Sequence, residues 1–85
     1  MSYKFRLTNT FLKDKKKLEI EVRNRITKGM KEILENPYSA GIELVGNLKG
    51  LWKKRIGKYR IIYEIIENRK MVVFHSVKLR KKVYR

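Results

Sequence analysis

Residues 51–65, LWKKRIGKYRIIYEI, constrain the fold more than any other segment, because they match two β-strands joined by a two-residue turn. A glycine at the first turn position, Gly57, followed by Lys58, suits a hairpin turn that fits the right-handed twist of paired strands. With this turn, Arg55 lies directly opposite Arg60. We therefore expect a β-hairpin at the centre of the fold.

In the expected register, one face of the hairpin is apolar and the other is basic. Directly opposed residues share a face, and faces alternate along each strand. The face expected to cover the core carries large apolar side chains, namely Trp52, Ile56, Tyr59, Ile61, Tyr63 and Ile65. The open face is expected to carry three cations, one isoleucine and one acid, namely Lys53, Arg55, Arg60, Ile62 and Glu64.

The facing arginines oppose a rule of sheet stability. Like charges directly opposite each other cost from a few tenths to about 1 kcal/mol. A cost with no visible structural compensation indicates a functional demand on that face. The alternative is that surface strands carry cations to prevent edge-to-edge aggregation. It explains Lys54 and Lys58, whereas two facing arginines beside Lys53 favour a binding surface.

The remaining segments show strand and helix periodicities. Alternation in residues 2–7, SYKFRL, predicts a half-buried strand. Apolar spacing from the capping residues of TNT, at 8–10, to Pro37 predicts two antiparallel helices or one bent helix. The expected helices cover about residues 10–17 and 20–36, a loop covers 38–47, and strands follow near 50–56, 59–66 and 71–77, with a second turn at Asn68–Arg69.

These elements predict an α+β fold in the order β-α-α-β-β-β, within a single domain of residues 1–85. We expect a small, antiparallel-rich sheet with a helical hairpin packed on one face and a basic open face on the other. No apolar run approaches the length of a membrane span, and the first residues lack the apolar stretch of a signal peptide. We therefore expect a cytoplasmic protein with no membrane partner.

The charge and the metal-ligating residues narrow the function classes. The net charge is +15, of which +4 comes from residues 1–43 and +11 from residues 44–85. Such a field attracts polyanions, meaning nucleic acid, an anionic membrane surface or an acidic protein. The chain has no cysteine and one histidine, so we expect no disulfide, no metal site and no cofactor.

The block from Leu44 to Ile65 contains the pattern Leu-Trp-Lys-x-Arg-x-Gly-x-Tyr-Arg-x-x-Tyr, and the segment LRKKVY follows later and ends at Tyr84. With the helix end ILENP at residues 33–37, these motifs resemble the RelE toxins of bacterial and archaeal toxin–antitoxin systems, within the RelE/ParE superfamily. The absence of glutamine, with abundant Lys, Arg, Glu and Ile, is a hyperthermophile bias that points to an archaeal or thermophile member.

The resemblance implies an endonuclease that enters the ribosomal A site, cuts messenger RNA without a metal and is inhibited by a RelB-like antitoxin in a hetero-oligomer. In that family the 2′-hydroxyl attacks the neighbouring phosphate. Lys53 and Arg55 match the basic residues that bind phosphate and help activate the hydroxyl, and Arg60 matches the arginine that stabilises the transition state. Arg80 matches the proposed general acid, and Tyr84 the proposed general base.

Six further cations are expected to bind RNA: Lys4, Arg6, Lys54, Lys81, Lys82 and Arg85. In one departure from the family pattern, Lys78-Leu79-Arg80 stands where many relatives have Gly-His or Gly-Lys before the arginine, so a histidine at that site is ruled out. His75 is expected opposite Ile62 on the face of Arg60, but a lone strand histidine is usually structural, and we assign it no role.

Two other functions stay open. One is a ParE-like toxin of the same fold, which poisons DNA gyrase and is no nuclease. That branch shares the central arginine motif but typically lacks the full set of five residues assigned to catalysis. The other is a basic RNA-binding or ribosome-associated protein without catalytic activity, whose binding would depend steeply on salt and yield no cut product.

Overall fold

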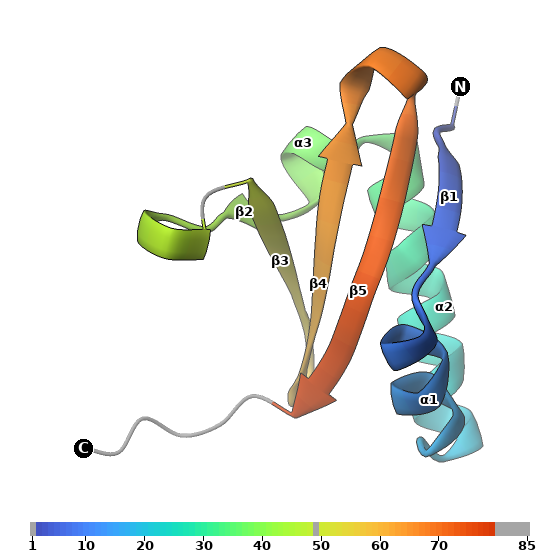
Figure 1. The fold of residues 1–85 in the computed structure, drawn as a ribbon. Coiled ribbons are helices and arrows are strands. Elements are labelled where there is room, and N and C mark those ends of the chain that lie inside the picture. The colour runs from blue at the N-terminus through green and yellow to red at the C-terminus, as the bar shows by residue number, and fades with distance from the viewer. Residues whose placement is uncertain (1, 49, 80–85) are drawn as a thin grey trace.

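Five strands form one mixed sheet in the order β1-β5-β4-β3-β2 in a computed structural model that describes residues 2–48 and 50–79 (Figure 1). The helices and strands along the chain are β1 (Lys4–Leu7), α1 (Asn9–Lys16), α2 (Ile20–Glu35), α3 (Pro37–Ala40), β2 (Ile42–Glu43), β3 (Leu51–Ile56), β4 (Tyr59–Ile66) and β5 (Met71–Leu79). β1 pairs with β5 in parallel, and all other pairs are antiparallel. The predicted α+β class is confirmed.

The β3–β4 hairpin has the predicted register. Ile56 pairs with Tyr59, and Arg55 pairs with Arg60. Gly57 has a φ of +59°, which suits the first position of the expected turn and which other residues rarely adopt. The local turn chemistry and the alternation of side chains therefore agree with the structure.

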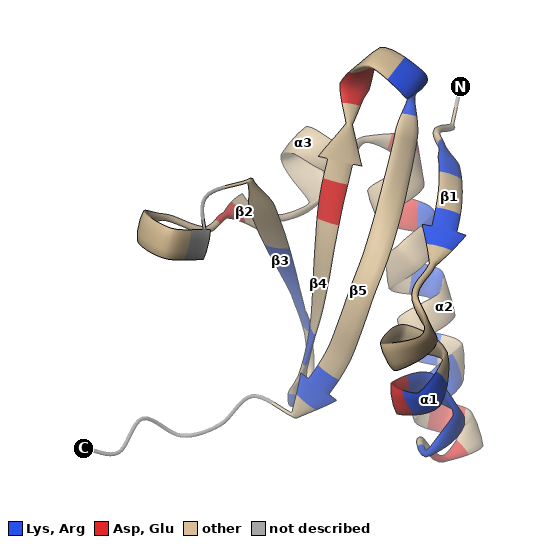
Figure 2. Cartoon of the chain, in the orientation of Figure 1, with Lys and Arg blue, Asp and Glu red and all other residues tan. Residues whose placement is uncertain are grey.

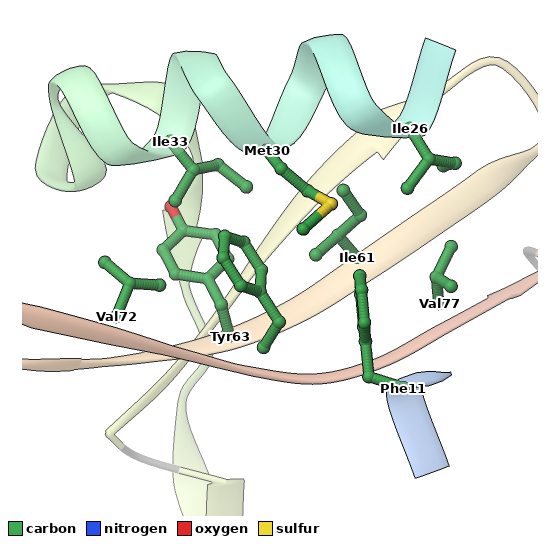
Figure 3. Close-up of a cluster of buried hydrophobic side chains, with 9 residues drawn as sticks. Phe11, Ile26, Met30, Ile33, Ile61, Tyr63, Val72 and Val77 are labelled. Atoms are coloured by element: carbon green, nitrogen blue, oxygen red, sulfur yellow. The ribbon is translucent and has the colours of Figure 1, made fainter. Parts of the chain in front are cut away.

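Helices α1 and α2 lie along one face of the sheet and enclose the core (Figure 1). In Figure 3 the side chains of Ile26, Met30 and Ile33 point from α2 toward Ile61 and Tyr63. The cluster is completed by Phe11 of α1 and by residues of β5, namely Val72, Phe74 and Val77. The helical hairpin thus covers one face of the sheet, as predicted. Within the part of the chain that the structure describes, no helix is long and apolar enough to cross a membrane.

Residues 38–47, expected to form a loop, contain part of helix α3, strand β2 and most of a short 3₁₀ turn at Gly46–Leu48. Pro37 at the start of α3 is pre-organised for helical geometry. Gly41 then allows the chain to lie against β3, because a Cβ atom there would stand 2.4 Å from the carbonyl oxygen of Lys53. This close approach places β2 beside β3.

The form of the second turn, and the register of β5 beyond Phe74, differ from expectation. A 3₁₀ turn at Glu67–Arg69, followed by Lys70 at a φ of 50°, replaces the two-residue turn. The β4–β5 register then shifts between Ile62 and Tyr63, where a β-bulge adds one residue to β5. Ser76, not His75, therefore lies opposite Ile62.

Glu67 ties this second turn to two other parts of the fold. Its carboxylate accepts hydrogen bonds from the hydroxyls of Tyr3, at 2.7 Å, and Tyr38, at 2.8 Å, and pairs with Lys70. The hydrogen bonds from Lys70, Tyr3 and Tyr38 lower the pKa of Glu67 to about 2. One side chain thereby connects the β4–β5 turn with the residue before β1 and with α3.

Candidate functional site

A row of three cations crosses the open face of the sheet. Arg55 of β3 pairs with Arg60 of β4, and Arg60 also pairs with Lys78 of β5. Directly paired residues share a face, and neighbouring strands lie about 5 Å apart. The Cβ atoms of the three residues are therefore close neighbours. Figure 2 shows lysine and arginine gathered where β3, β4 and β5 come together.

Lys53 extends this row along β3. It pairs with Ile62, which lies two residues from Arg60 on the same face of β4. Lys53 and Arg60 are therefore diagonal neighbours, roughly 7–8 Å apart. We call Lys53, Arg55, Arg60 and Lys78 the basic patch.

Three members of the basic patch carry charge that no acid neutralises within residues 2–48 and 50–79. Lys53, Arg55 and Arg60 take part in none of the ion pairs of this part of the chain. Arg55 is exposed, and Lys53 and Arg60 are partly exposed. Their positive charges can therefore meet an anionic ligand without first breaking an ion pair.

Lys78 is held by an acid from the neighbouring helix. Its Nζ atom lies 3.1 Å from Asp14 Oδ1, and the backbone N–H of Val77 donates to Asp14 Oδ2 at 3.2 Å. Strand β1 stops pairing at Phe74, so α1 covers the edge of β5 from there on. The same carboxylate thus accepts a hydrogen bond from an edge N–H group and pairs with the ammonium group of Lys78. Sequence reasoning gave Lys78 no role.

One acid and the histidine share the open face with the basic patch. His75 Nε2 lies 3.0 Å from Glu64 Oε1, and both side chains are partly exposed. Glu64 lies two residues beyond Ile62 along β4, on the same face. A pair of groups that can carry a proton therefore adjoins the cations.

The cations predicted to bind RNA fall in two different places. Lys4 and Arg6 pair with Met71 and Val73 at the other end of the open face. Val73 in turn pairs with Glu64, four residues along β4 from Arg60, a separation of about 13 Å.

Lys54 does not join the open face. Its Nζ atom lies 3.2 Å from Glu32 Oε1 of α2 and donates to the carbonyl of Ala40 at 3.3 Å. The alternation of the strand turns its side chain to the helical face, away from its neighbours Lys53 and Arg55. The predicted RNA contact at Lys54 is therefore not part of the basic patch.

The remaining predicted residues, namely Arg80, Lys81, Lys82, Tyr84 and Arg85, lie outside the described residues. The described part of β5 ends at Leu79, which pairs with Tyr59, one position past the row formed by Arg55, Arg60 and Lys78.

A hollow adjoins the basic patch on the side of β2. It has a volume of about 280 Å³ and is lined by Ala40, Gly41, Ile42, Lys53, Lys54 and Arg55.

No group of three or more metal-ligating side chains occurs among the described residues. The arrangement is suited to binding phosphate groups of an extended polyanion across the strands.

Comparison with known proteins identifies the relatives of this chain. The sequence profile of a family described as "ParE toxin of type II toxin-antitoxin system, parDE" matches residues 5–84. No curated protein matches the sequence.

Several solved structures share the fold. The toxin–antitoxin complex RelBE2 from Mycobacterium tuberculosis matches with a TM-score of 0.87 and 27% identity, covering 94% of this chain and 100% of the other. The isolated RelE toxin of E. coli matches with a TM-score of 0.83 and 27% identity, covering 96% of this chain and 88% of the other. The archaeal RelE–RelB complex from Pyrococcus horikoshii, at 21% identity and a TM-score of 0.78 over 98% and 100% of the two chains, shows the likeness of fold.

Proposed function

Because this chain belongs to the ParE toxin family of type II toxin–antitoxin systems, we propose that it acts as a toxin that cleaves messenger RNA in the ribosomal A site. The observation that carries the proposal is the set of three cations, Lys53, Arg55 and Arg60, on neighbouring strands of one open face, which form no ion pair with any described residue. Such a surface suits a phosphodiester whose charge grows during cleavage.

The proposed reaction is attack of the 2′-hydroxyl on the adjacent phosphorus, which requires RNA rather than DNA. Lys53 and Arg55 would bind the scissile phosphate and help activate the hydroxyl. Arg60, between Arg55 and Lys78, would stabilise the negative charge on the non-bridging oxygens. Arg80 as general acid and Tyr84 as general base complete the proposed set. Alignment of the message by the ribosome would supply the positioning that this small site lacks.

We further propose that a RelB-like antitoxin binds and inhibits this chain in a hetero-oligomer. The similar structures include toxin–antitoxin complexes from Mycobacterium tuberculosis and E. coli, at 27% and 25% identity. A chain with a net charge of +15 repels itself and attracts acidic surfaces. A partner that covers this charge would keep the toxin inactive in the cytoplasm.

A second candidate function is inhibition of DNA gyrase. The observation in its favour is that the family profile that matches residues 5–84 is named for ParE. Inhibition of gyrase does not require cations that bind a phosphodiester. It therefore does not explain why the basic patch lies on the open face of β3, β4 and β5.

The test is primer extension on a defined message, with purified protein, in the presence and absence of ribosomes that have an empty A site. The proposal expects cuts within the A-site codon only when ribosomes are present. The absence of cuts, together with inhibition of gyrase in a parallel assay, would replace the proposal with the second candidate. The absence of both activities, with salt-dependent RNA binding, would leave a basic binding protein.

A further inference from the structure

His75 and Glu64 form a hydrogen-bonded pair on the open face, and the donor of this bond can be assigned. A carboxylate only accepts hydrogen bonds, so the imidazole Nε2–H is the donor across the 3.0 Å contact. In the neutral form of the imidazole, the other ring nitrogen, Nδ1, then carries a lone pair. In the described part of the chain, Nδ1 has no hydrogen-bond partner. The pair therefore presents an oriented imidazole with a free proton acceptor.

The β-bulge is the reason that His75 and Lys78 both belong to this face. Phe74 lies in the core opposite Tyr63, and Val77, three residues later, is also buried. Regular alternation would place residues 76 and 78 with Phe74 on the core face. The extra residue reverses the alternation, so Ser76 pairs with Ile62 on the open face.

The backbone of the bulge is fixed from the edge of the sheet. Thr8 donates from its hydroxyl to the carbonyl of His75 at 2.9 Å, and from its N–H to the carbonyl of Phe74 at 3.2 Å. The Thr8 hydroxyl also accepts from the N–H of Phe11 and caps α1. A bulge secured in this way can hold a side chain in one direction.

Ile62 is the point at which these groups meet. It pairs with Lys53 on one side and with Ser76, the neighbour of His75, on the other. Arg60 and Glu64 lie two residues away along β4, about 7 Å in either direction. A phosphodiester lying over Ile62 would have cations on one side and the imidazole on the other.

We propose that His75, in place of Tyr84, is the catalytic residue that accepts the proton of the attacking 2′-hydroxyl, with Glu64 as its positioning residue; this inference rests on the proposed cleavage of RNA and changes only its general base. The 2′-oxygen forms a bond to phosphorus as its proton passes to His75 Nδ1. The bond from phosphorus to the 5′-oxygen breaks, and the departing oxygen takes a proton from the general acid proposed above, which regains a proton from solvent. The products are a 2′,3′-cyclic phosphate and a 5′-hydroxyl, and the imidazolium returns its proton to solvent. A carboxylate that orients an imidazole in this way is a recurring arrangement in proton transfer.

Charged groups face the imidazole from several elements. Glu64 of β4 is in contact with it. Lys53 of β3 pairs with Ile62, and Arg60 lies two residues before Ile62 on β4. Arg6 of β1 pairs with Val73 on the same face. Asp14 of α1 is engaged by Lys78 and by the N–H of Val77. Glu64 is thus the described acid that acts on His75 directly.

The test is single-turnover cleavage on ribosomes with an empty A site, as a function of pH, for the wild-type protein and His75→Gln. Glutamine can still donate to Glu64 but offers no basic nitrogen. The inference expects wild-type cleavage to slow as the pH falls, because a protonated imidazole cannot accept the proton of the 2′-hydroxyl. His75→Gln should cleave about 10²- to 10⁴-fold more slowly and should lose this acid limb.

Glu64→Gln is the second variant, and it should slow cleavage while an acid limb from His75 remains. Binding to antitoxin serves as the check that each variant is folded. A His75→Gln protein that cuts at the wild-type rate, or slowly with the same acid limb, would overturn the inference and leave the proposed function intact. No cleavage by the wild-type protein would overturn the proposed function and this inference with it.

Discussion

Arg55 and Arg60 lie directly opposite each other in the β3–β4 pair, on the face that the helices leave open. Such an arrangement costs stability, and no acid among the described residues offsets it. The fold therefore keeps a locally unfavourable contact at the place where we propose that RNA is cut. A site that holds like charges together before its ligand arrives is expected to exchange stability for function.

Removal of one of these charges should stabilise the fold. Arg55→Thr is expected to raise the free energy of unfolding by up to about 1 kcal/mol at low salt. The gain should shrink at high salt, because screening already weakens the repulsion. Urea unfolding at two salt concentrations measures it. Lys4→Thr is the matched control, since Lys4 pairs with Met71 and not with a cation. A loss of stability for Arg55→Thr at both salt concentrations would refute the repulsion argument.

The buried hydroxyl of Tyr63 should contribute strongly to stability. It donates to the carbonyl of Pro37 at 2.8 Å, and burial raises the pKa of Tyr63 to about 12. Tyr63→Phe leaves that carbonyl without this partner and is expected to cost about 1–3 kcal/mol in urea unfolding. Tyr59→Phe is the control, because within residues 2–48 and 50–79 the tyrosine hydroxyls that form hydrogen bonds are those of Tyr3, Tyr38 and Tyr63, and not that of Tyr59. Equal effects of the two substitutions would show that the bond to Pro37 contributes little.

Glu67 should make stability depend on pH in the acid range. Its folded-state pKa, about 2, lies below its ordinary value of 4.5. A lowered pKa means that the contribution is complete above the ordinary value and is lost as the pH falls toward the folded value. The thermal unfolding temperature of the wild type should therefore fall as the pH is lowered from about 4.5 to about 2. Glu67→Gln should be less stable than the wild type at neutral pH, and its unfolding temperature should fall less over this pH range. If the unfolding temperatures of both proteins fall equally, the effect belongs to other carboxylates.

Asp14 should stabilise the edge of β5 through two contacts. Asp14→Ala removes the acceptor of the Val77 N–H and the partner of Lys78, and is expected to cost about 1–3 kcal/mol. Asp14→Asn keeps an acceptor for the N–H and loses only the ion pair with Lys78, whose side chain is 62% exposed, so its cost should stay below about 1 kcal/mol. Urea unfolding of both variants separates the two contributions. A larger cost for asparagine than for alanine would contradict this assignment.

Local sequence signals were sufficient for the central hairpin. The Gly57–Lys58 turn and the alternation of β3 and β4 determine which residues oppose each other, and the opposition of Arg55 and Arg60 follows from them. The two long helices follow from their apolar spacing and from Pro37. Each of these features depends on neighbours in the sequence, so a single sequence contains the necessary information.

Features that depend on contacts between residues distant in the sequence were not predicted. β2 has two residues and no periodicity of its own, and it forms because Gly41 lets the chain approach β3. The membership of Lys78 in the basic patch depends on the bulge before it. The sequence does contain a trace of that bulge, because the buried residues Phe74 and Val77 are three positions apart in a strand where alternation requires two or four.

The most direct test of the central claim compares Arg60→Ala with Arg69→Ala in single-turnover cleavage on ribosomes with an empty A site. Both variants lose one arginine, but Arg69 lies in the turn between β4 and β5, at the other end of β4 from Arg60. With antitoxin binding retained in both, Arg60→Ala should cleave at least about 10²-fold more slowly than the wild type, because it removes a group that stabilises the transition state. Arg69→Ala should stay close to the wild type. Equal activity of the two variants would contradict the claim that the basic patch is the cleavage site.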